Sequence, residues 1–174
     1  MRLGVFRRCF SRTQRLTQYK NDESQYPIWP DVFAYADGAS RGNPGRSGCG
    51  ALLVDPMTGN VLATDAKYVG DYETNNAAEY HGLVLALQMA QRHQVTHVHI
   101  RMDSQLIVRQ MQGQYQVKAA NLRRLYQQCK DLSAKLPHVT FTHVNREKNV
   151  KADQLANEVI DAHAASIEGD LIDH

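Results

Sequence analysis

This chain has few cysteines and no long apolar run. The 174 residues include three cysteines, Cys9, Cys49 and Cys129, which lie far apart and form no C-x-x-C pair. This pattern argues against a disulfide scaffold and a cysteine-based zinc site, and it favours a reducing compartment. No apolar segment approaches the roughly 18–20 residues that span a bilayer. These shortages argue against a small secreted protein or a membrane protein, and the composition is that of a globular domain.

Acidic residues are missing from the first 21 positions, which are rich in arginine. Residues 1–30 carry a net charge of 6 − 2 = +4, so the rest of the chain carries −2 of the total of +2. The two prolines of Tyr26–Pro30 mark a boundary. We expect residues 1–30 to be either a basic arm or a mitochondrial transit peptide, whose composition they resemble. One domain should follow over residues 31–165, and residues 166–174 should form a loose acidic tail.

The location that we expect is intracellular. It is mitochondrial if the N-terminal segment is a transit peptide, and cytoplasmic or nuclear otherwise.

Hydrophobic periodicity predicts an α/β domain with a five-stranded mixed sheet and helices on both faces. Three strands precede the first helix, which predicts an antiparallel meander, and helices separate the last two strands, which should be parallel. A glycine-rich turn is expected over Gly38–Gly48. The expected strands are residues 31–37, 49–54, 61–69, 95–103 and 139–144, and the expected helices are residues 75–92, 104–112, 119–136 and 149–165.

Four acidic residues occupy notable positions. Asp37 and Asp103 each end a strand, Glu79 lies about one turn into a helix, and Asp153 lies near the start of the last helix. If the first and fourth strands are parallel neighbours, Asp37 and Asp103 project from the same end of the sheet, where sites form in such folds. Clustered carboxylates repel one another unless a cation joins them, and oxygen ligands alone favour Mg²⁺ or Mn²⁺. Two such ions about 3.5–4 Å apart promote phosphodiester cleavage.

Each acid taken alone also fits an ordinary structural role. An aspartate after a strand often forms a turn, and an acid near a helix start interacts favourably with the helix dipole. The residues by themselves leave both interpretations open.

Four segments resemble the motifs of type 1 ribonucleases H, in the same order and over about residues 31–162. They are Asp37–Gly45 (DGASRGNPG), Thr74–Glu79 (TNNAAE), Asp103–Gln105 (DSQ) and Asn149–Asp153 (NVKAD). The resemblance implies the ribonuclease H fold, dependence on a divalent metal, and endonucleolytic cleavage of the RNA strand of RNA–DNA hybrids. It also implies 5′-phosphate and 3′-hydroxyl ends.

The resemblance assigns roles to individual residues. Asp37, Glu79, Asp103 and Asp153 would be the catalytic acids, which bind two Mg²⁺ ions, with Mn²⁺ as an alternative. The amides that would contact RNA 2′-hydroxyls are those of Asn43, Asn75 and Gln105, since an amide both donates and accepts hydrogen bonds. The residues that would hold a phosphate of the DNA strand are Thr74 and Asn76.

The chain departs from the family pattern in two places. Many members carry a mobile histidine in a glycine-containing loop before the last aspartate. Here the loop is short and His143 is expected within a strand, so a product-release role would fall to Arg146, Glu147 or Asn149. The second departure is the missing basic handle, because Lys118 is the only charge in Gly113–Ala120. The groups that would compensate are the N-terminal arm, Arg41, Arg46, Arg123 and Arg124.

Two other functions remain alternatives to an RNA–DNA hybrid endoribonuclease. One is a different nuclease on the same fold, against which the set of amides at Asn43, Asn75 and Gln105 argues. The other is a non-catalytic hybrid-binding domain, against which the presence of all four acids argues. We expect a monomer that binds the hybrid and needs neither a membrane nor an obligate protein partner.

Overall fold

A computed structural model of the chain describes residues 29–172. The N-terminal arm or transit peptide, and the location that depends on it, therefore concern residues outside the described part. The elements are β1 (Asp31–Gly42), β2 (Gly45–Val54), β3 (Val61–Glu73), α2 (Asn75–Arg92), β4 (His97–Met102), α3 (Gln105–Met111), α4 (Ala120–Ala134), β5 (His138–His143), the short 3₁₀ helix η1 (Arg146–Lys148) and α5 (Val150–Ile172).

The five strands form one mixed sheet in the order β3-β2-β1-β4-β5. β2 pairs antiparallel with β1 and β3, whereas β4 pairs parallel with both β1 and β5. The expected meander and parallel pair are thus confirmed. Because β1 and β4 run in the same direction, with Ala34 opposite Ile100, their C-terminal ends lie at the same end of the sheet.

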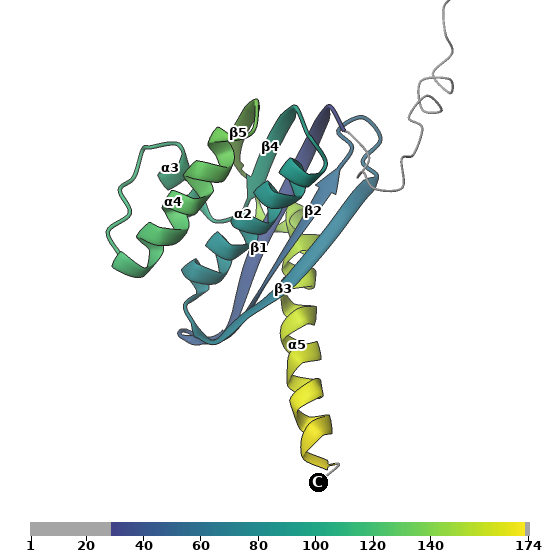
Figure 1. Cartoon of the computed structure of the whole chain (residues 1–174), viewed down its shortest axis with the longest axis vertical. Coiled ribbons are helices and arrows are strands. Elements are labelled where there is room, and N and C mark those ends of the chain that lie inside the picture. The colour runs from purple at the N-terminus through teal and green to yellow at the C-terminus, as the bar shows by residue number, and fades with distance from the viewer. Residues whose placement is uncertain (1–28, 173–174) are drawn as a thin grey trace, which may run out of the picture.

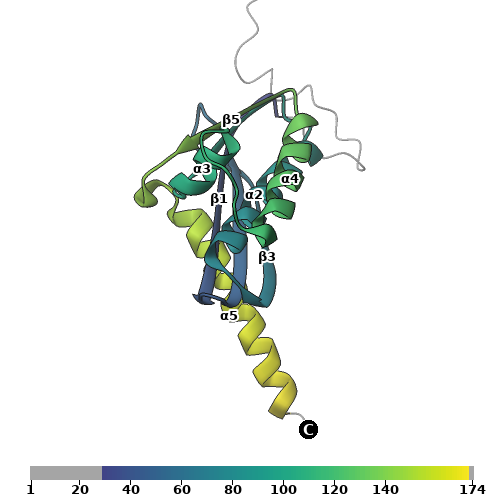
Figure 2. The ribbon, with the colours of Figure 1, turned by 90° about the vertical axis from the view of Figure 1, so that its left-hand side faces the viewer.

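The helices cover the sheet on both faces (Figures 1 and 2). α2 lies between the sheet and α4, while α5 packs on the opposite face against β1, β2 and β3. The position of α2 explains why its buried residues extend beyond the single stripe expected from its sequence. Leu83 and Leu87 are fully buried, and Tyr80 donates a hydrogen bond from its hydroxyl to Gln110 Oε1 of α3 at 2.8 Å.

The expected glycine-rich turn over Gly38–Gly48 is wrong. β1 and β2 continue through these positions, and only Asn43 and Pro44 separate them. A Cβ atom at Gly38 would lie 2.0 Å from the carbonyl carbon of Ala78, and one at Gly48 would lie 2.6 Å from the carbonyl oxygen of Ala156. These two glycines therefore allow α2 and α5 to approach the two faces of the sheet closely.

The last helix also differs from the expectation. α5 continues to Ile172 instead of ending at Ala165, so the expectation of a loose tail over residues 166–174 is wrong for residues 166–172. The end of α5 extends past the edge of the sheet (Figure 1). Among residues 29–172, no helix is both long and apolar enough to cross a lipid bilayer.

The close approach of α5 to β2 predicts a cost for any side chain at Gly50. A Cβ atom there would lie 2.5 Å from Leu155 Cβ and 2.7 Å from the carbonyl oxygen of Ala152. We expect Gly50→Ala to lower the free energy of unfolding by about 1–3 kcal/mol, as overpacking does. Urea denaturation followed by circular dichroism measures this change.

Gly70→Ala is the matched control within the same sheet. Its Cβ atom would meet only Glu73 Cγ at 3.6 Å, an ordinary contact. This variant should differ from the wild type by less than about 1 kcal/mol. Equal effects of the two substitutions would contradict the packing argument.

Candidate active site

The four acids predicted from the motifs line one cavity of about 330 Å³. Asp37 comes from the middle of β1, Glu79 from the second turn of α2, Asp103 from the residue after β4, and Asp153 from the first turn of α5. Polar side chains make up most of the remaining wall: Ser40, Arg41, Asn75, Arg146 and Asn157. The fold therefore gathers residues that lie far apart in the sequence, at the end of the sheet where β1 and β4 both point.

Asp37 is the most deeply placed of these acids. Its side chain is buried, and the backbone N–H of Gly38 donates to Asp37 Oδ1 at 2.8 Å. Burial, followed by the negative charge of Asp103, raises the pKa of Asp37 to about 8. Glu79 and Asp153 act in the same direction, so this carboxyl group lies where extra negative charge is costly.

Glu79 is held by one of its oxygens. Asn75 Nδ2 donates to Glu79 Oε1 at 3.1 Å, along one turn of α2. Burial raises the pKa of Glu79, and hydrogen bonds from Ser104 and Asn75 oppose that shift. The second oxygen, Oε2, is buried and has no hydrogen-bond partner within the described residues. A buried acceptor without a partner at this point leaves one coordination position for a cation.

The two remaining acids have different neighbours. Asn149 Nδ2 donates to Asp103 Oδ1 at 2.8 Å. Asp153 is more accessible, with its side chain 34% exposed, and the Arg146 guanidinium lies 3.6 Å from its Oδ1. Solvent exposure thus increases across the cavity, from the buried Asp37 to the accessible Asp153.

The residues of this cavity fit a hard divalent cation. They supply carboxylate and amide oxygens, with no cysteine or histidine among the residues that line the cavity. The orphaned Glu79 Oε2 and the repulsion felt by Asp37 both call for positive charge. Within residues 29–172, no three acidic, histidine or cysteine side chains are already grouped around a common metal position.

The residues expected to contact substrate lie around the cavity rim. Asn75 lines the cavity, and its backbone N–H donates to Asn43 Oδ1 of the β1–β2 hairpin at 3.1 Å. Gln105 is exposed at the first position of α3. Thr74 is the N-cap of α2, where its hydroxyl accepts from the N–H of Ala77, and Asn76 is partly buried. Their contacts with a substrate remain predictions.

The loop before α5 is short and largely ordered into η1. Arg146 lines the acidic cavity, whereas Glu147 lies outside it. Asn149 is 1% exposed and contacts Asp103, which distinguishes it from a mobile loop residue. His143 ends β5 as expected, and its Nε2 lies 3.2 Å from the carbonyl oxygen of Asp103. Sequence reasoning did not anticipate that contact, because the two residues are 40 positions apart.

A second, larger cavity of about 500 Å³ lies on the α5 face of the sheet. Most of its wall is apolar, and the Arg101 guanidinium lies 3.3 Å from the ring centroid of Phe33 and donates to the Tyr35 hydroxyl. One of its two acids, Asp55, accepts hydrogen bonds within its own turn. The smaller, polar cavity is therefore the candidate active site.

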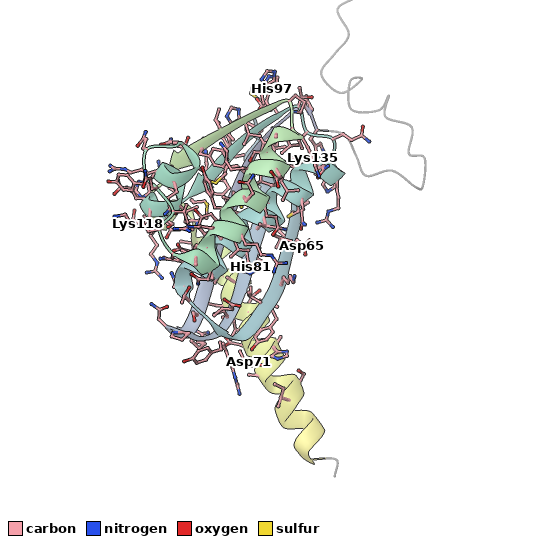
Figure 3. All side chains as sticks on the ribbon, turned by 60° about the vertical axis from the view of Figure 1, so that its left-hand side comes forward. Asp65, Asp71, His81, His97, Lys118 and Lys135 are labelled. Carbon is pink, nitrogen blue, oxygen red and sulfur yellow. The ribbon has the colours of Figure 1, made fainter. Side chains whose placement is uncertain are left out.

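The segment between α3 and α4, where no basic handle is expected, contains no helix. Lys118 projects from its outer edge (Figure 3). Arg123 of α4 donates to the carbonyl oxygens of Val117 and Lys118, at 3.3 and 3.1 Å, so this arginine fixes the segment.

Comparison with known families agrees with this geometry. A model described as "Reverse transcriptase-like" matches residues 35–159, which include all four acids. The chain belongs to the type 1 ribonuclease H family. Its fold matches the ribonuclease H domain of a Mycobacterium tuberculosis protein, with 40% identity, a TM-score of 0.75, and coverage of 80% of this chain and 99% of that one.

Two further ribonuclease H1 structures are similarly close. That of Halobacterium salinarum is 38% identical with a TM-score of 0.72, and covers 76% of this chain and 98% of that one. A ribonuclease H1 named LC11, solved with an RNA/DNA hybrid, is 39% identical with a TM-score of 0.71, over 76% of this chain and 99% of that one.

Some relatives of this chain are much longer. A bifunctional protein of Mycobacterium tuberculosis is 41% identical over 139 residues, which is 80% of this chain but 38% of that protein. The ribonuclease HI of Halobacterium salinarum is 39% identical over 130 residues, which is 64% of its length. The chain therefore spans well under half of the first of these relatives.

The raised pKa of Asp37 predicts a pH-dependent stability in metal-free protein. The folded state keeps a proton on Asp37 up to about pH 8, whereas the unfolded chain releases it near its ordinary value of 3.8. Stability is then greatest at low pH and falls as the pH rises toward 8. In EDTA, Asp37→Asn should be more stable than the wild type at pH 8, on the order of a few kcal/mol. Chemical denaturation between pH 5 and 8.5 measures both curves.

The difference in stability between the wild type and Asp37→Asn should be smaller at pH 5, where Asp37 is protonated in the folded state. Saturating Mg²⁺ should also reduce the loss of wild-type stability at pH 8. A constant difference between the two proteins across this range would contradict the electrostatic explanation.

Proposed function

We propose that this protein is an endoribonuclease that hydrolyses the RNA strand of RNA–DNA hybrids. The observation that carries the proposal is the convergence of Asp37, Glu79, Asp103 and Asp153 on one polar cavity in a chain of this family. Relatives named ribonuclease H, and the LC11 enzyme solved with an RNA/DNA hybrid, support the same substrate class.

The four acids would hold two divalent ions, Mg²⁺ or Mn²⁺. When bound, such ions lower the pKa of a water molecule and stabilise negative charge on the phosphate and on the leaving oxygen. Asp37 and Glu79 supply the buried part of the ligand set, and Glu79 Oε2 is available because no described residue donates to it. Asp153 and Arg146 lie at the accessible side, where the scissile phosphate would enter. The products would carry 5′-phosphate and 3′-hydroxyl ends.

Selection of RNA would depend on amide side chains beside the cavity. Asn75 Nδ2 is committed to Glu79, which leaves Asn75 Oδ1 as an acceptor for a ribose 2′-hydroxyl. Asn43 Oδ1 is committed to the backbone of Asn75, which leaves its NH₂ group as a donor. Gln105 is exposed and offers both kinds of group. Thr74 and Asn76 would contact a phosphate of the DNA strand.

The cleavage assay uses three end-labelled duplexes, RNA–DNA, RNA–RNA and DNA–DNA, with Mg²⁺, Mn²⁺ or EDTA. We expect internal cuts only in the RNA of the hybrid, and none in EDTA. Asp103→Asn keeps the size of the side chain but removes its charge, so it should reduce turnover at least about a hundredfold. Asp131→Asn, an exposed acid of α4 bonded to Gln127, is the control and should leave turnover unchanged.

The assay also separates the alternatives. Tight hybrid binding without cleavage would support a non-catalytic binding domain, and cleavage of DNA or of free ends would support another nuclease of the same fold. Wild-type turnover by a folded Asp103→Asn protein would contradict the assigned acid set. Sedimentation of the same preparation tests the proposed monomer.

We also propose that residues 1–30 form a basic arm that binds the phosphate backbone, and that the protein is cytoplasmic or nuclear if they do so and mitochondrial if they are a transit peptide. Their six basic residues offset the acidic charge of the rest of the chain. Removal of residues 1–28 should weaken hybrid binding and reduce its salt dependence, with turnover at saturating substrate unchanged. Trp29 is kept because its ring stacks on His93, with 4.2 Å between ring centroids. Fluorescence anisotropy at several salt concentrations measures the slope.

Replacement of the six basic residues by glutamine in the full chain is the matched control. It should reproduce the effect of the deletion if charge is responsible. An unchanged affinity and salt slope in both variants would instead favour a mitochondrial transit peptide, which a fluorescent fusion would locate.

A further inference from the structure

Asn149 makes contacts that no catalytic acid makes. It is 1% exposed, and its Nδ2 donates both to Asp103 Oδ1, at 2.8 Å, and to the carbonyl oxygen of Ala36, at 3.1 Å. One NH₂ group thus bonds both to β1 and to the residue that follows β4.

These two bonds connect three of the four elements that carry the acids. Ala36 precedes Asp37 in β1, Asp103 follows β4, and Asn149 itself precedes α5, where Asp153 lies. The backbone N–H of Asp153 donates to the carbonyl oxygen of Asn149 at 3.1 Å. A movement of Asn149 would therefore change the position of Asp103 relative to both other aspartates.

The side chain of Asn149 does not act as an ordinary helix cap. An asparagine before a helix usually accepts an N–H of the first turn with its side-chain oxygen. Here Oδ1 is buried and has no hydrogen-bond partner within the described residues, and the N–H of Ala152 bonds to the backbone carbonyl of Asn149 at 3.0 Å. Backbone atoms thus start the helix, and the amide nitrogen faces the acids.

A neutral donor suits this position. A lysine or arginine would neutralise Asp103 and compete with a cation, whereas an acid would repel it. A neutral NH₂ group fixes one oxygen of the carboxylate and leaves its negative charge in place. The other oxygen, Oδ2, is not engaged by Asn149.

We propose that Asn149 is a positioning residue that fixes the Asp103 carboxylate between β1 and α5, so that Asp103 is arranged for a divalent cation before the cation binds. This inference rests on the proposed function. It adds a residue that acts through Asp103 and contacts neither substrate nor water in the reaction.

The test compares Asn149→Ser and Asn149→Asp with the wild type. Serine and aspartate are both good residues before a helix, so α5 should remain intact in each variant. Neither supplies the NH₂ group. Mn²⁺ binding without substrate, measured by titration calorimetry, should weaken about ten- to hundredfold in Asn149→Ser, as for other residues that orient metal ligands. Turnover should fall by a similar factor in both variants, with KM for the hybrid nearly unchanged.

Two controls make the result specific. Asn121→Asp, in the exposed first turn of α4, should change neither Mn²⁺ affinity nor turnover. In the Asp103→Asn background, Asn149→Ser should cause little further loss of Mn²⁺ affinity, because the carboxylate that it positions is already gone. If Asn149 had only a structural role, the losses of Mn²⁺ affinity caused by Asn149→Ser and Asp103→Asn would be additive. They would then follow the changes in the free energy of unfolding.

The outcomes distinguish this inference from the proposed function. Wild-type Mn²⁺ affinity and turnover in folded Asn149→Ser and Asn149→Asp would overturn the positioning role while leaving the ribonuclease intact. A wild-type protein that cuts no hybrid, but whose Mn²⁺ affinity depends on Asn149, would overturn the proposed function and support the positioning role. Circular dichroism verifies folding, and Asn149→Asp serves for the turnover test if Asn149→Ser is unfolded.

Discussion

The repulsion among four carboxyl groups is the constraint on which the rest of this structure depends. Asp37 is buried where burial and three other acids all raise its pKa, so the site is costly to assemble without a cation. Asp37, Glu79 and Asp153 come from β1, α2 and α5, and Asp103 directly follows β4. The parallel pairing of β1 and β4 brings Asp37 and Asp103 to the same end of the sheet, and the two helices that carry Glu79 and Asp153 approach from opposite faces. Rigid framework contacts thus oppose a repulsion that would otherwise spread the acids apart.

Close packing of the helices on the sheet is what holds the acids together against their repulsion. A Cβ atom at Gly82 of α2 would lie 2.3 Å from the carbonyl oxygen of Asp37, and one at Gly38 would overlap the backbone beside Glu79. Glycines on both partners therefore let the α2 backbone lie directly against the strand that carries Asp37. On the other face, Gly48 and Gly50 do the same for α5. The distance between acids and the packing of the core are consequently set by the same residues.

Local patterns in the sequence predicted most of this arrangement, and the errors have a common physical origin. The alternation of Val32, Ala34 and Ala36 predicted a buried strand face, and the resemblance of four motifs to those of type 1 ribonucleases H predicted which acids converge. The glycines of residues 38–48 were interpreted as a turn because a sequence pattern does not show that a helix from elsewhere covers them. The role of Asn149 was missed for the same reason, since its partners Ala36 and Asp103 are 113 and 46 positions away. Contacts between distant segments decide these features, whereas periodicity records only local preference.

Exposed arginines bear on how a nucleic-acid backbone could bind beside an acidic cavity. Within the described residues, Arg41 pairs with Asp161 at 2.9 Å and Arg46 approaches Asp71 at 3.8 Å, and all four side chains are substantially exposed. Exposed pairs of this kind contribute only about 0–1 kcal/mol, so a phosphate group competes with the carboxylate for the same arginine at small cost. These arginines are paired across β1 and β2 on either side of Asn43, next to the amides that would recognise ribose. With no basic handle between α3 and α4, the hairpin and the start of α2 are the surfaces on which a phosphate backbone and a 2′-hydroxyl would be bound together.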